Sequence, residues 1–160
     1  MTTPSQPGIR VVLLRLAAFY WASQIFWLSS DSFHSSNSRV IIAKLARMLG
    51  LDLSSETLWV LNTIARKSAH VVEYAVFSIL LYFSFRGLDW PSWDQRAARM
   101  SLMAACAYAM LDEFRQGFSL YRGSSPFDFA LDCFGATLGI AMIYAGCRAY
   151  REAALARHSG

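Results

Sequence analysis

Charged side chains are scarce in this chain, and their scarcity argues against an ordinary soluble domain. Only 16% of the 160 residues are Asp, Glu, Lys or Arg, whereas soluble domains average about 25%. Hydrophobic residues make up 55% of the chain, and the mean hydropathy is +0.31. Because the apolar residues gather in runs of membrane length, the composition predicts an integral membrane protein.

Cysteine is rare as well, and the short motifs of many soluble enzymes are missing. Cys106, Cys133 and Cys147 fall in apolar runs without CxxC spacing, which favours buried packing over metal binding. The chain has no GxSxG, P-loop, dinucleotide-binding or HExxH motif. The net charge of +4 comes from arginines that flank apolar segments, so it favours a membrane over a nucleic-acid partner.

Four apolar segments predict membrane-spanning helices. They run from about 9 to 28, 69 to 85, 97 to 114 and 129 to 150. Each approaches the roughly 20 residues that a helix needs to span a bilayer, although the second and third are short. The length leaves no room for a separate soluble domain. We therefore expect one all-α membrane domain, a polytopic bundle of about four transmembrane helices.

The connection between the first two segments is more polar than the rest. The run 35–38 is suited to cap a helix that begins near residue 39, and Gly50 is suited to end that helix. Ser54 or Ser55 is suited to cap a second short helix. Both helices are too short and too charged to span a membrane. We expect them to be amphipathic and to lie on the membrane surface or to cover the bundle.

Basic residues set the expected orientation. With four spans, both termini lie on one side, which holds eight Arg, while the opposite side holds seven Lys or Arg. Lys67, Arg115 and Arg122 lie among polar motifs, so we count them toward a site and not toward topology. The remaining bias places both termini and the turn at 86–99 in the cytoplasm.

Polar residues gather at one predicted end of the bundle, where the second segment begins, the third ends and the fourth begins. Spacings of three and four residues place polar side chains on a shared helix face. The groups are Lys67, His70, Glu73 and Tyr74 on the second segment, Glu113 and Gln116 on the third, and Asp128 and Asp132 on the fourth, and Asp112 lies beside Glu113 at the same end. Gly135 and Gly139 follow on the Asp132 face and allow close helix approach. Because a charged group costs roughly 2.5–3.5 kcal/mol at the membrane centre, this gathering indicates a working site.

The same residues carry a family resemblance. The string Arg-Lys-Ser-Ala-His-Val-Val-Glu-Tyr at 66–74 is followed by Asp-Glu-Phe-Arg-Gln at 112–116, and then by Arg122, Asp128, Asp132, Gly135 and Gly139. This pattern closely resembles the VanZ-like family over about residues 21–144. Its members are small multi-helix bacterial membrane proteins, named for a protein linked to teicoplanin resistance. The resemblance implies a single VanZ-like domain over residues 1–160, an inner-membrane location, a cell-envelope role and a link to glycopeptide resistance.

The polar residues are expected to fill two roles. His70, Glu73, Asp112 and Glu113 are the predicted acid, base or catalytic groups. The predicted ligand-binding residues are Lys67, Tyr74, Gln116, Arg122, Asp128 and Asp132. Lys67 and Arg122 suit a phosphate or carboxylate group. The leading hypothesis is therefore that the cluster, expected on the periplasmic side, binds an anionic lipid or a lipid-linked envelope precursor from the surrounding bilayer.

Two alternatives stay open beside headgroup binding. The first is a membrane enzyme that carries out acid/base or metal-assisted hydrolysis or transfer on such a headgroup. With several carboxylates and a single cluster histidine, a metal there would be Mg²⁺, Mn²⁺ or Ca²⁺ and not zinc, but the sequence assigns no metal ligands and no cofactor. The second is a structural scaffold whose polar cluster only fixes helix packing.

Overall fold

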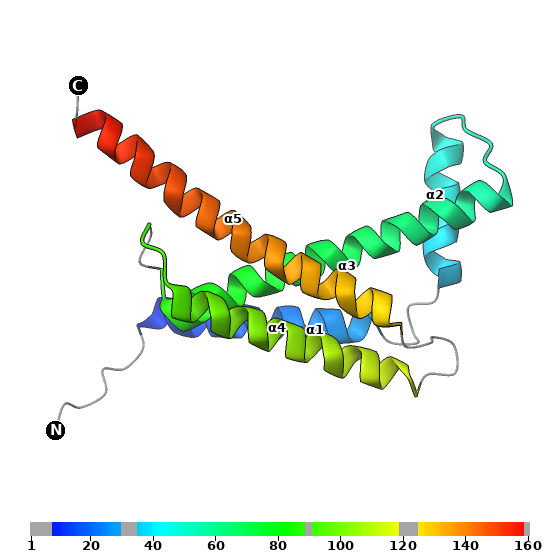
Figure 1. Ribbon diagram of the computed structural model, residues 1–160. Helices are drawn as coiled ribbons and strands as arrows, with labels where there is room; N and C mark the ends of the chain where they lie inside the picture. The colour runs from blue at the N-terminus through cyan, green and yellow to red at the C-terminus, as the bar shows by residue number, and fades with distance from the viewer. Residues whose placement is uncertain (1–7, 30–34, 89–90, 119–124, 159–160) are drawn as a thin grey trace.

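Five α-helices form the part of the chain that the computed structural model describes, which is residues 8–29, 35–88, 91–118 and 125–158, without the side chains of 35–37 and 158 (Figure 1). The helices are α1 (Ile9–Leu28), α2 (Ser35–Met48), α3 (Ser55–Arg86), α4 (Gln95–Gln116) and α5 (Pro126–His158). No strand occurs in these residues. The predicted all-α fold is confirmed.

Three of the described helices, α1, α3 and α5, are long and apolar enough to cross a membrane. The helical membrane bundle is thus confirmed, with three such helices where the sequence predicted about four. The helix α4 was predicted as the third span. It has 22 residues, but five of them are charged, near its two ends, and this lowers its hydropathy below that of the other three.

The contact between α3 and α5 is the most extensive in the bundle and rests on two glycines. A Cβ atom on Gly135 would lie 2.9 Å from the Cα of Val71, and one on Gly139 would lie 3.0 Å from the carbonyl carbon of Ala75. Backbone atoms cannot give way as a flexible side chain can, so glycine alone permits this approach. The close packing predicted from these glycines is confirmed. It brings Asp132, about one turn before Gly135, to the height of α3 where the polar residues lie.

The helix α3 runs unbroken through a point where the sequence predicted two separate helices, so that prediction was wrong. The Ser54 side chain caps α3 by accepting a hydrogen bond of 3.2 Å from the backbone N–H of Thr57, and Gly87, with a φ of 86°, follows its end. Its 32 residues give a length of about 48 Å at 1.5 Å per residue, more than the roughly 30 Å of a bilayer core. Its first half therefore runs beyond α1 and α4 (Figure 1).

The helix α2 packs against this first half of α3 and crosses it at a steep angle (Figure 1). It begins at Ser35, before the predicted start, and it ends at Met48, with Gly50 just after its end as predicted. The φ of Gly50 is 74°. Its N–H donates to the carbonyl of Arg47 at 3.0 Å, and the N–H of Leu51 donates to that of Ala46 at 2.9 Å. These two bonds define a Schellman motif, which explains why the chain turns here.

A stripe of buried small residues lets α4 pack closely against its neighbours. Its members recur every three or four residues: Ala98, Ser101, Ala105 and Ala109, continued by Asp112 and Gln116. Such spacing keeps all of them on one helix face. The stripe that builds the apolar core therefore also carries two polar side chains into its end.

Candidate functional site

His70 and Asp132 join α3 to α5 at the polar end of the bundle. The Nδ1 atom of His70 lies 3.0 Å from Oδ1 of Asp132. The Asp132 side chain is fully buried, whereas that of His70 keeps 16% of its surface exposed. The Nε2 atom of His70 has no hydrogen-bond partner among the described residues. A buried carboxylate that orients Nδ1 in this way leaves Nε2 free to exchange a proton with a ligand or to bind one.

A second network ties the end of α1 to the end of α4 around Asp112. Oδ1 of this buried carboxylate accepts hydrogen bonds from Ser29 Oγ at 2.6 Å and from Arg115 Nη2 at 2.8 Å. Oδ2 accepts one from Gln116 Nε2 at 2.8 Å. The guanidinium of Arg115 also donates to Ser29 Oγ at 2.7 Å. Both oxygens of Asp112 are engaged within the protein, which is the arrangement that a structural carboxylate needs.

Three buried oxygen atoms of the predicted site have no hydrogen-bond partner in the described part of the chain. They are Oη of Tyr74, Oε1 of Glu113 and Oδ2 of Asp132. The other oxygen of Glu113 accepts a hydrogen bond of 2.7 Å from the backbone N–H of Ser125, just before α5. Each unpartnered buried group costs about 1–3 kcal/mol. A cluster that served only helix packing would not need buried oxygens without hydrogen-bond partners.

Two cavities meet at His70. The larger, of about 180 Å³, lies between α1, α2 and α3, and its lining includes Ser29, Ser38, Arg66, His70 and Glu73. The smaller, of about 100 Å³, is lined by Thr63, Arg66, Lys67, His70 and Asp128. The basic residues of both cavities lie on α3, one turn before His70, and each cavity also holds one acidic residue, Glu73 in the larger and Asp128 in the smaller.

The predicted site residues divide between these surroundings. Lys67 and Asp128 line the smaller cavity, with the ammonium of Lys67 4.2 Å from the ring centre of Phe127. Glu73 lines the larger cavity, and its backbone carbonyl accepts a hydrogen bond from the Trp21 indole at 2.9 Å.

Apart from His70, the other predicted site residues of the described part do not line the cavities. Tyr74 and Glu113 are buried, and Gln116 belongs to the Asp112 network. The predicted residue Arg122 lies outside the described residues.

Three residues of these networks were given no role in the predicted site, although Arg115 had been counted toward a site. Ser29 and Arg115 complete the Asp112 network, and Arg66 lines both cavities. The sequence held a signal for Arg115, which stands three residues after Asp112 and so shares its helix face. Arg66 stands four residues before His70 and was detectable in the same way. Ser29 carried no such signal, because its partner lies 83 residues away.

No group of three or more His, Cys, Asp or Glu side chains in the described ranges is placed to hold a metal ion. His70 and Asp132 form a pair. The acids of the cluster are dispersed over α3, α4 and α5, and the α4 carboxylates bond to protein groups.

The helices and the buried polar cluster define a helical membrane protein with a polar site at one end of its bundle. A family model described as VanZ/LLP1 matches residues 13–148. Since this match covers most of the chain, the protein belongs to the VanZ/LLP1 family, which confirms the family resemblance of its motifs. No curated protein and no solved structure matches the chain.

Proposed function

We propose that this protein is a multi-pass bacterial inner-membrane protein that binds the anionic headgroup of a lipid or of a lipid-linked envelope precursor. The binding place is the pair of cavities at His70. The observation that carries the proposal is the combination of Arg66 and Lys67 on the cavity walls with a histidine held by a buried carboxylate. These groups supply charge and hydrogen bonds for a phosphate or carboxylate.

The headgroup assignment follows from where the charges lie. Arg66 and Lys67 line the cavities together with Glu73 and Asp128, while the unpartnered oxygens of Asp132 and Tyr74 are buried away from solvent. An anionic group is attracted to Arg66 and Lys67 on the cavity walls. The position at the end of the bundle, where α1 and α4 end, suits a ligand whose tail stays in the bilayer.

We further propose that α4 crosses the bilayer as the fourth span. The helix α3 passes from the His70 end of the bundle to the Arg86 end, and α5 begins again at the His70 end. The chain must therefore return, and the 22 residues of α4 supply about 33 Å. Its charged residues stand near the two ends, where interfacial water is available. The basic-residue bias supports cytoplasmic termini and a periplasmic polar cluster.

The His70–Asp132 pair also favours a second candidate, a membrane enzyme acting on the same headgroup. An imidazole whose Nδ1 is held by a carboxylate has Nε2 available as a general base toward water. A link to glycopeptide resistance, as the family's name suggests, fits either candidate, because both place the protein at envelope lipids. The Asp112 network is the part of the cluster that fits a scaffold role.

The test is native mass spectrometry of the full chain, purified from bacterial membranes with its lipids. We expect an anionic phospholipid or polyprenyl phosphate to be retained, and its occupancy to fall about fivefold or more in Arg66→Gln and Lys67→Gln. The control is Arg157→Gln, an exposed residue near the other end of α5. Equal occupancy in all three variants would contradict the binding proposal. Release of a hydrolysed headgroup during incubation would select the enzyme.

A further inference from the structure

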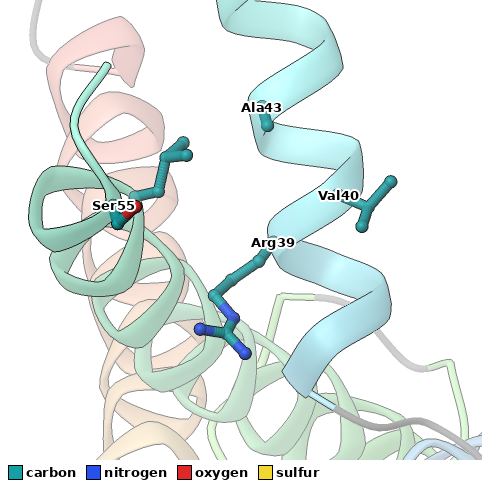
Figure 2. A pocket seen from close by; sticks show the side chains of 5 residues that line it. Arg39, Val40, Ala43 and Ser55 are labelled. Atoms are coloured by element: carbon teal, nitrogen blue, oxygen red, sulfur yellow. The ribbon is translucent and has the colours of Figure 1, made fainter.

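A groove outside the polar cluster lies between α2 and the start of α3 (Figure 2). It has a volume of about 280 Å³ and is lined by Arg39, Val40 and Ala43 of α2 and by Ser55 and Leu58 of α3. Figure 2 shows the Arg39 side chain leaving α2 toward the space beside α3. An apolar wall next to a single guanidinium is the pattern of a site for an anionic amphiphile.

The guanidinium of Arg39 makes no hydrogen bond or ion pair with the described residues. The helix α2 has a net positive charge, because it carries Arg39, Lys44 and Arg47 and no acidic residue. A juxtamembrane basic residue is attracted to an anionic lipid surface. The charge of the groove therefore complements an acidic lipid.

The outer face of α2 indicates where the groove sits. Its large apolar side chains outside the groove stay exposed: Ile41 at 55%, Leu45 at 56% and Met48 at 82%. In an amphipathic helix attached to a membrane bundle, such a face inserts among lipids at headgroup depth. The opposite face, which carries Arg39 and Ala43, looks into the groove. Lipid is therefore the molecule next to the groove opening.

We propose that this groove binds one anionic phospholipid of the surrounding bilayer. Its phosphate contacts Arg39, and part of an acyl chain lies against Ala43 and Leu58. A volume of 280 Å³ is close to the lower limit of roughly 300 Å³ for small-molecule pockets, so it accommodates a segment of one chain and not a whole lipid. This site is separate from the cavities at His70 and does not rest on the function proposed for them.

The test uses Trp59, which is 59% exposed and follows Leu58 directly in α3. The full chain is reconstituted in phosphatidylcholine vesicles that contain either brominated phosphatidylglycerol or brominated phosphatidylcholine at the same mole fraction. Bromine quenches nearby tryptophan, and subtracting the signal of Trp59→Phe isolates the contribution of Trp59. We expect Trp59 to be quenched more strongly by the anionic lipid.

Two variants of the same helix separate the groove from general surface charge. Arg39→Gln should reduce the preference for the anionic lipid about fivefold, whereas Lys44→Gln, which removes an equal charge from the outer face, should reduce it less. Arg39→Lys should retain most of the preference. Equal quenching by the two lipids, or equal losses in the Arg39 and Lys44 variants, would overturn the proposal.

Discussion

The Nδ1 atom of His70 lies 3.0 Å from Oδ1 of Asp132, although the two residues are 62 positions apart in the chain. The contact exists because α3 and α5 touch through their backbones at Gly135 and Gly139. Larger residues there would move Asp132 away from α3. The contact between His70 and Asp132 therefore depends on the two glycines at the helix crossing.

The two single substitutions of this pair should together lower the free energy of unfolding by more than the double substitution does. In a double-mutant cycle of His70→Ala and Asp132→Ala, we expect a coupling energy of about 0.5–3 kcal/mol, because each single variant leaves a buried polar group without its partner. Chemical unfolding in detergent measures the four free energies. Strictly additive effects would mean that the contact contributes nothing to stability.

A larger side chain at the glycine crossing of α3 and α5 should destabilise the bundle. Gly139→Leu should destabilise the bundle by about 1–3 kcal/mol, since a Cβ there already meets the Ala75 backbone. Ala141→Leu adds bulk to an exposed position of the same helix and should leave the melting temperature nearly unchanged. The thermal stability of both variants in one detergent decides the matter, and similar losses would contradict a local clash.

Asp112 was predicted as a catalytic group, and its surroundings predict a structural effect. Asp112→Ala should lower stability by about 2 kcal/mol or more, because Ser29, Arg115 and Gln116 lose their shared acceptor. Glu152 offers a matched control, as it pairs with Arg148 at 2.7 Å on an exposed surface. Glu152→Ala should leave the stability nearly unchanged, because the pair is exposed to solvent. An Asp112 variant of normal stability that fails to bind lipid would instead assign this residue to the ligand.

Hydropathy was a sound guide to the fold but a poor guide to helix length. It located α1 at 9–28, and it ended the last span near 150, whereas α5 continues to His158. It also split α3 at Arg66 and Lys67, although no Gly or Pro occurs between residues 51 and 86. Charged residues are unfavourable inside a membrane, but they do not end a helix. The absence of Gly and Pro was the signal that one helix continues through Arg66 and Lys67.

The site was predictable to the extent that it depends on helical periodicity. Periodicity grouped His70 with Lys67, and Asp132 with its glycines, and the close helix approach then brought the two faces together. It did not separate Asp112 from Glu113. Neighbouring residues point in different directions on a helix, so the first bonds toward α1 and the second toward Ser125. Which neighbour each one meets depends on tertiary packing.

The orientation can be measured with single cysteines on a cysteine-free background. Phe118, 75% exposed and just after α4, marks the His70 end of the bundle, and Leu88, 48% exposed and just after α3, marks the opposite end. We expect a membrane-impermeant maleimide added to intact spheroplasts to label Phe118→Cys, and to label Leu88→Cys only after lysis. The reverse pattern would place the polar cluster in the cytoplasm.

Substitution of Tyr74 distinguishes a polar cluster that binds a ligand from one that only supports helix packing. Its hydroxyl is fully buried and has no partner among the described residues, so Tyr74→Phe should leave the free energy of unfolding within about 1 kcal/mol or raise it. If the cluster serves a ligand, the same variant should retain less lipid in native mass spectrometry, because it removes a hydrogen-bonding group beside Asp132. Tyr108→Phe is the comparison, since the Tyr108 hydroxyl donates to the carbonyl of Ala22 at 2.7 Å, and its loss should lower stability by about 1 kcal/mol. A Tyr74→Phe protein that is clearly destabilised but still binds lipid would assign the hydroxyl to structure.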